Sequence, residues 1–305
     1  MNLKLSSRDV ALMAIFAALS AIVVKVIPGI PIIGLSDASI KFDAALAPIY
    51  GMIIGPYLGF LAGLVGGLVV ANHWFSVLTS LATAISAFVA GFIVQSVHAS
   101  EEKRIHGWMI ATAVVGLLIL GWYATWVGQQ APFYPILHIA GFLITLVGRG
   151  KIAKAFEKEG ESGRSWQPKP YFLLFGILVL VLGFIFSKQN LRPLEIFAYF
   201  SLPLYLVSGV AIIYGLLGSK VREKFVIAVV LAGYCGIIAD HMVGNLLFIQ
   251  FAVPLGVPPE ILPSLFMEVL PISVVERLLF TAIATIVGVG LISSIRRAGL
   301  YSKKE

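Results

Sequence analysis

The chain consists of long apolar runs separated by short segments rich in polar residues, glycine and proline. A helix needs about 20 apolar residues to cross the hydrocarbon core of a bilayer. Lipid offers the backbone no hydrogen-bond partners, so only helices and closed barrels can span it. The runs therefore predict about ten transmembrane helices, at 9–27, 42–55, 57–72, 74–97, 107–127, 132–148, 171–187, 196–217, 225–251 and 271–295.

Five glycines recur at every fourth residue of one apolar stretch: Gly51, Gly55, Gly59, Gly63 and Gly67. This spacing places them on one side of a helix, or of two short helices joined at Gly55-Pro56. Bare backbone lets a neighbouring helix approach closely, as small-xxx-small patterns do in membranes. We therefore predict a tightly packed membrane hairpin in 42–72, and packing alone is sufficient to explain the glycines.

The amino-acid composition narrows the class of protein further. Of 305 residues, 59% are hydrophobic and 12% are charged, whereas a soluble domain has about 25% charged residues. The chain is therefore predicted to be an all-α polytopic membrane protein whose environment is the lipid bilayer. Its net charge of +7 does not indicate a nucleic-acid partner, because the basic residues lie in loops between apolar runs. The one cysteine, Cys235, excludes an intrachain disulfide.

The distribution of Lys and Arg predicts the orientation in the membrane. Cytoplasmic loops of membrane proteins carry an excess of these residues. If the N-terminus is cytoplasmic and the helices alternate, most of the 22 Lys and Arg residues fall on the cytoplasmic side. We therefore expect a multi-pass protein of the cell (plasma) membrane with both termini in the cytoplasm and a cytoplasmic loop at 149–170. The exceptions are Lys25, Lys41, Lys188, Arg192 and Arg277.

Polar residues within or beside the apolar runs gather toward the predicted outer side. A carboxylate at the centre of a membrane helix costs about 2.5–3.5 kcal/mol on insertion scales, so such residues are functional candidates. An apolar pocket with a few fixed polar groups is what a small polar molecule entering from outside would need. The predicted substrate-binding residues are Asp37, Lys41, Asn72, His73, Trp74, Asp240, His241, Asn245 and Glu276.

Several of these residues also have a purely structural interpretation. Asn72 and His73 can end a helix, because short polar side chains compete for backbone hydrogen bonds. Trp74 suits the aromatic belt at the membrane surface. Arg277 can extend to the surface along its aliphatic stem, and as a neighbour of Glu276 on a helix it is expected to point in a different direction. Asp240 is the strongest functional candidate, since it lies near the middle of its helix, with an interhelical hydrogen bond as the alternative.

The sequence lacks the common motifs for metal, nucleotide and hydrolase chemistry. No HxxxH, HExxH or CxxC spacing occurs, so no metal site is predicted. No GxxxxGK[ST] loop occurs, so this chain is not expected to hydrolyse ATP itself. No GxSxG sequence marks a nucleophile. We predict no cofactor.

The stretch from Ile40 to Gly67, with Pro48 and the glycines described above, resembles the second and third helices of the S components of energy-coupling-factor (ECF) transporters. The first helix contains the overlapping pairs Ala14/Ala18 and Ala17/Ala21, and the segment 261–295 resembles the family's last helix. The resemblance covers about 9–97 and 225–297. It implies an S-component-like six-helix core formed by 1–98 and 225–305, with 99–224 as inserted helical hairpins that supply four more helices.

The resemblance also implies a function. S components bind a small water-soluble compound, such as a vitamin or its precursor, and work with a transmembrane coupling subunit and two ATPase subunits. The small residues Ala14, Ala17, Ala18 and Ala21 would form the groove for the coupling subunit. Two alternatives remain open from the residues alone: an ion-coupled secondary transporter with Asp240 as the proton or sodium site, and a membrane enzyme that uses His241 and carboxylates. The resemblance favours a transporter subunit that is not an enzyme.

Overall fold

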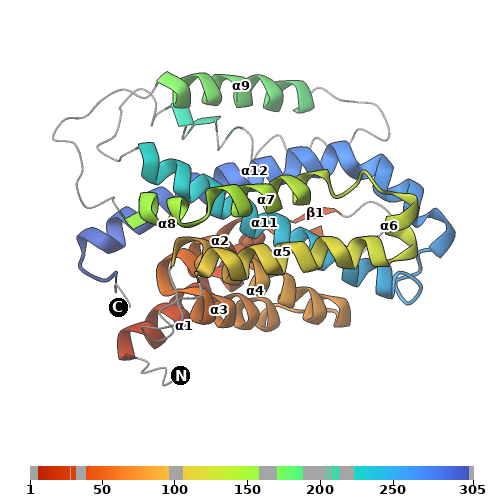
Figure 1. Ribbon diagram of the computed structural model, residues 1–305, viewed down its shortest axis with the longest axis horizontal. Coiled ribbons are helices and arrows are strands. Elements are labelled where there is room, and N and C mark those ends of the chain that lie inside the picture. The colour runs from red at the N-terminus through yellow and green to blue at the C-terminus, as the bar shows by residue number, and fades with distance from the viewer. Residues whose placement is uncertain are drawn as a thin grey trace.

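The computed structural model describes residues 6–27, 29–31, 39–95, 106–157, 170–187, 205, 208–209, 211–212 and 223–301. In these residues the fold is a bundle of helices that run along a common direction (Figure 1). Two antiparallel strands of two residues each precede α2. The elements are α1 (Ser7–Val26), β1 (Ile30–Pro31), β2 (Ser39–Ile40), α2 (Asp43–Ile54), α3 (Pro56–Val69), α4 (Trp74–Val94), α5 (Gly107–Ala124), α6 (Trp126–Gln130), α7 (Ile136–Gly148), α8 (Gly150–Glu157), α9 (Pro170–Ser187), α11 (Glu223–Phe251), η3 (Pro259–Ile261) and α12 (Leu262–Arg297).

Among the described residues, five helical segments are long and apolar enough to cross a membrane: α1, α4, α5, α11, and η3 together with α12. The pair α7 and α8, bent by 75°, would make a sixth, and α2 and α3 are shorter apolar helices. The prediction of a helical membrane protein is therefore confirmed. The count of ten helices stays a prediction, because most of 196–217 lies outside the described residues.

One predicted boundary is wrong. The last helix begins at Leu262 and not at 271, and it continues through Pro271. Proline removes one backbone donor and disfavours the interior of a helix in water. In a membrane protein, neighbouring helices and side chains can satisfy the freed backbone group, and the alternative of irregular backbone in lipid is costly.

The predicted hairpin in 42–72 is confirmed, and its glycines pack against α4. A Cβ atom at Gly51 would overlap the backbone carbonyl oxygen of Ala87. A Cβ at Gly63 would lie 3.0 Å from the carbonyl oxygen of Thr83, closer than normal contact. Gly55, between α2 and α3, has a positive φ of 89°, which L side chains rarely adopt. These glycines therefore bring α2, α3 and α4 into backbone contact.

Helix α11 lies at the centre of the bundle, in contact with α2, α4, α5, α7, α8 and α12. It is joined to α7 by polar contacts as well as packing: the Tyr234 hydroxyl donates to the Leu137 carbonyl oxygen at 2.8 Å, and Cys235 Sγ to that of Gly141 at 3.6 Å. The helices between 107 and 157 therefore pack directly onto α4 and α11. Whether 99–224 is an insertion stays a prediction.

Basic residues gather at one end of the bundle. The first turn of α1, α8 and the last turn of α12 all lie at the left end in Figure 1. There the Arg296 guanidinium lies 4.4 Å from the ring centroid of Phe156 and 4.6 Å from that of Tyr301, and its NH1 donates to the Phe156 carbonyl oxygen at 2.9 Å. These contacts fasten the end of α12 to α8.

Candidate functional site

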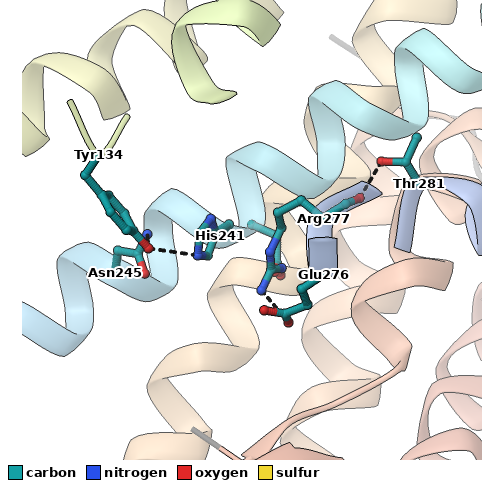
Figure 2. Close-up of polar contacts among 7 residues, drawn as sticks. Tyr134, His241, Asn245, Glu276, Arg277 and Thr281 are labelled. Carbon is teal, nitrogen blue, oxygen red and sulfur yellow. Dashed lines mark hydrogen bonds and ion pairs between the residues drawn. The ribbon is translucent and has the colours of Figure 1, made fainter. Parts of the chain in front are cut away.

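A buried arginine brings the ionic residues of α11 and α12 together. The side chain of Arg277 on α12 is fully enclosed, with 1% of the residue exposed. Its NH2 donates to Glu276 Oε1 at 2.6 Å (Figure 2). Its NH1 lies 3.8 Å from Asp240 Oδ2 on α11. The expectation that Arg277 extends to the surface is wrong, and so is the expectation that it diverges from Glu276. The reason is that two carboxylates hold the guanidinium in the interior, where an unpaired charge would be far more costly.

Some N–H donors of the Arg277 guanidinium have no acceptor among the described residues. In the described part of the chain, its Nε and NH1 atoms have no hydrogen-bond partner. The face of the Phe280 ring lies 5.4 Å from the guanidinium carbon and supplies an apolar boundary. Buried donors without partners carry a desolvation penalty of about 1–3 kcal/mol each. A ligand that brings acceptor atoms would remove that penalty.

Beside this ionic group lies a neutral hydrogen-bonded group. The Tyr134 hydroxyl, in the segment between α6 and α7, lies 3.2 Å from His241 Nε2 on α11. Asn245, one turn further along α11, donates from Nδ2 to the same hydroxyl at 3.3 Å. The hydroxyl accepts from Asn245, and either the hydroxyl or His241 Nε2 can be the donor in the second contact, depending on the tautomer of His241. Figure 2 shows His241 between Tyr134 and Arg277, so the neutral and ionic groups adjoin.

Aromatic rings enclose the neutral group. Trp122, at the end of α5, stacks on Tyr134 with ring centroids 4.7 Å apart, and Phe266 of α12 meets both rings edge-on at 5.0 and 4.9 Å. All three side chains are buried. Fixed polar groups beside an apolar wall are the usual composition of a small-molecule site. Here four elements contribute: α5, the α6–α7 segment, α11 and α12.

The comparison with known proteins identifies the class of protein. The family model described as "ECF-type riboflavin transporter, S component" matches residues 4–157, which is half of the chain. The chain belongs to this family. No curated protein and no solved structure matches it. The chain is therefore a membrane transporter subunit that binds substrate for vitamin uptake, and it is not an enzyme.

The residues that match the family model, 4–157, include α5, α7 and α8. They thus extend into the segment 99–224 that was expected to be inserted, while α11 and α12 lie beyond them. The cluster therefore combines residues from the matched region, such as Tyr134, with residues from helices outside it, such as Asp240 and Arg277.

The S component brings four of the predicted binding residues into one place: Asp240, His241, Asn245 and Glu276. Asp240, Asn245 and Glu276 are buried, and His241 is partly buried. All four belong to the ionic or the neutral group described above, which Arg277 and Tyr134 complete.

The other predicted residues lie elsewhere. Asn72, His73 and Trp74 are exposed at the turn between α3 and α4. There His73 Nδ1 accepts from the Phe75 N–H at 3.2 Å and caps α4, and Trp74 packs edge-on against Phe251, with centroids 5.6 Å apart. Phe251 ends α11, about 15 Å along the helix from His241 at 1.5 Å per residue.

The structure describes only one of the two predicted binding residues that precede α2. Lys41 is half-buried just before α2, and its charge interacts with the buried carboxylate of Asp43. Asp37 lies outside the described residues. A role for either in binding stays a prediction.

Besides Arg277 and the aromatic rings, two polar residues of the cluster were missed in the sequence: Tyr134 and His138, whose ring stacks on His241 with centroids 5.3 Å apart. His138 is an ionisable residue inside an apolar run, so the reasoning that selected Asp240 would have selected it too. Tyr134 lies in a short connection with nothing local to distinguish it. Its position in the site depends on how α7 packs against α11.

The predicted docking residues on α1 face different ways. Ala14 and Ala18 are exposed, Ala21 is half-buried and Ala17 is buried. Ala17 packs toward α3, where a Cβ at Gly66 would lie 3.1 Å from its carbonyl oxygen. Ala14 and Ala18 therefore lie on the outer surface of the bundle, whereas Ala17 serves the packing of α1 within it.

Proposed function

We propose that the S component binds riboflavin or a closely related flavin between α7, α11 and α12, at the cluster around Arg277. The family description names riboflavin. The observation that supports this choice is the set of unpartnered Arg277 donors beside the carboxylates of Asp240 and Glu276. The flavin ring carries a C=O, N–H, C=O sequence along one edge, which requires donors and acceptors side by side.

The apolar part of the ring would lie against the aromatic wall. Trp122, Tyr134 and Phe266 present stacked and edge-on faces of the kind that planar rings favour. His241 and Asn245 complete the polar lining. Lys41, Asn72, His73 and Trp74, with Asp37 in the preceding loop, would contact the substrate on its way in. Trp74 packs against Phe251 at the end of α11. This end of α11 lies at the opposite end of the bundle from the basic residues (Figure 1).

The remaining proposals concern orientation and partners. With the basic end of the bundle in the cytoplasm, both termini are cytoplasmic and the substrate enters from outside the cell membrane. The chain has no phosphate-binding loop, so the energy for uptake would come from two ATPase subunits through a transmembrane coupling subunit. The exposed residues Ala14 and Ala18 of α1 are the proposed contact with that subunit.

Riboflavin binding to the purified protein in detergent tests this function, with quenching of flavin fluorescence as the measurement. We expect saturable binding that falls at least about tenfold in Arg277→Lys, because lysine keeps the charge but loses the planar fork of donors. Arg297→Lys, at an exposed position in the last turn of α12, is the matched control and should bind like the wild type. A thermal unfolding curve of each variant establishes that it is folded.

Two outcomes would contradict the proposal. One is the absence of saturable flavin binding by the wild type, or equal binding by Arg277→Lys. The other is accumulation of substrate by the chain alone in proteoliposomes under an imposed proton or sodium gradient, which would indicate an ion-coupled secondary transporter with Asp240 as the coupling site.

A further inference from the structure

Two histidines from different helices form a buried pair beside the neutral group. His138 of α7 and His241 of α11 lie with ring centroids 5.3 Å apart and ring planes 23° apart. His138 is enclosed, with 1% of the residue exposed. Among the described residues, His241 Nδ1 has no hydrogen-bond partner, and neither ring nitrogen of His138 has one of good geometry, although the Pro135 carbonyl interacts with the His138 ring.

The ring nitrogens of the two histidines determine what the pair can offer. A neutral imidazole carries one N–H donor and one acceptor nitrogen, and either the Tyr134 hydroxyl or His241 Nε2 can be the donor in the contact between them. His241 Nδ1, which has no hydrogen-bond partner among the described residues, can therefore donate or accept. A neutral His138 adds one donor and one acceptor. The pair therefore presents donors and acceptors within one stacked unit, and Figure 2 shows His241, one of its two members, beside Arg277.

Alcohol hydroxyls match this arrangement, because each donates one hydrogen and accepts others. A phosphate does not, because it offers only charged acceptors and the nearby Asp240 and Glu276 are themselves acidic. When Asp240 and Glu276 are ionised, their two negative charges outnumber the single positive charge of Arg277, and the excess negative charge opposes the binding of a phosphate. The chemistry of the pair thus distinguishes a free hydroxyl chain from a phosphorylated one.

We infer, on the basis of the flavin-binding function proposed above, that His138 and His241 bind the hydroxyl groups of the substrate's side chain, whereas the Arg277 group binds its ring. The S component would then select flavins with a free polyol chain. It would discriminate against ring compounds without hydroxyls and against phosphorylated flavins.

Binding of three probes tests this inference: riboflavin, lumiflavin, which has the same ring with a methyl group in place of the polyol, and flavin mononucleotide. Wild-type protein is expected to bind riboflavin more tightly than either of the others. His138→Phe keeps a planar ring of similar size without nitrogens. It should weaken riboflavin binding by about fivefold to tenfold per hydrogen bond lost and leave lumiflavin binding unchanged.

Three further variants make the result decisive. His138→Asn retains a donor and an acceptor and should recover part of the preference for riboflavin. If His138→Phe does not fold, the same comparison of riboflavin with lumiflavin is made with His138→Asn and His241→Asn. His106→Phe, at the exposed start of α5, is the matched control and should change neither affinity.

Each other outcome overturns the inference. Equal losses for riboflavin and lumiflavin in His138→Phe would assign the pair to the packing of α7 on α11. Unchanged affinities for both would exclude the pair from the site. Binding of neither flavin by the wild type would instead refute the proposed flavin function, which distinguishes the two failures.

Discussion

At the scale of the residue, Arg277 dominates the energetics of the candidate site. Its guanidinium is enclosed between Glu276, Asp240 and the Phe280 ring. Removing one partner of a buried ion pair leaves an uncompensated charge, which costs about 3–5 kcal/mol, whereas replacing both partners by groups of similar shape can be nearly neutral. The two carboxylates therefore depend on Arg277 for their burial.

We predict that Arg277→Met lowers the free energy of unfolding by about 3–5 kcal/mol. Glu276→Gln in the same background should restore part of this loss, because it removes one of the two carboxylates left without a cation. Chemical denaturation in detergent, carried out on the single and double variants, measures the coupling. Additive effects of the two substitutions would show that the two side chains do not act as a pair.

At the scale of the element, the hairpin of α2 and α3 depends on the absence of side chains at its contact with α4. Gly51 meets the backbone of Ala87 and Gly91, and Gly67 meets the side chain and Cα of Ser80. The contact at Gly51 cannot adjust by a change of rotamer, because both surfaces there consist of main-chain atoms. The small-residue pattern is therefore a requirement for this packing and does not by itself indicate a binding site.

We expect Gly51→Ala to destabilise the protein by about 1–3 kcal/mol, because an added methyl group overlaps the Ala87 carbonyl oxygen and forces the helices apart. Gly290→Ala in α12 is the matched control, since nothing lies within 4 Å of a Cβ at that position. It should be neutral or stabilising by up to about 1 kcal/mol, because alanine favours a helix over glycine. Thermal unfolding in detergent compares the two, and equal melting temperatures would refute the close contact.

At the scale of the whole molecule, the proposed binding site and the proposed contact with the coupling subunit lie on different surfaces. The candidate site lies between α7, α11 and α12, whereas α1 packs mainly on α3 and α2 and leaves Ala14 and Ala18 exposed. Substrate affinity and interaction with the coupling subunit should therefore be separable by substitution.

A bulky residue on α1 tests this separation. Ala18→Trp should abolish flavin uptake in cells that express the complete transporter, because the side chain obstructs close helix contact, and should leave binding to the purified protein within about twofold of the wild type. Leu117→Trp, at an exposed position on α5, is the control and should support normal uptake. Uptake by Ala18→Trp at the wild-type rate would disprove docking through this face.

Particular residues show how far the sequence was sufficient. The hairpin of α2 and α3 was predictable because helix periodicity and glycine spacing are local properties. Asp240 was predictable as a buried functional candidate because a carboxylate in an apolar run is costly anywhere in the bilayer. The sequence could not distinguish a surface position of His73 from a buried one, because a histidine at the end of a helix is compatible with both.

The hydrophobic pattern, by itself, determined that this chain forms membrane helices, because lipid leaves the backbone no other means of satisfying its hydrogen bonds. It also determined the close packing around Gly51 and the candidacy of Asp240. Only the tertiary structure decided that Arg277 is turned inward to Asp240 and Glu276, and that Tyr134 and His138 meet His241. These contacts join residues up to 107 positions apart, so they depend on which helix faces pack together, and that is a property of the folded bundle and not of any one segment.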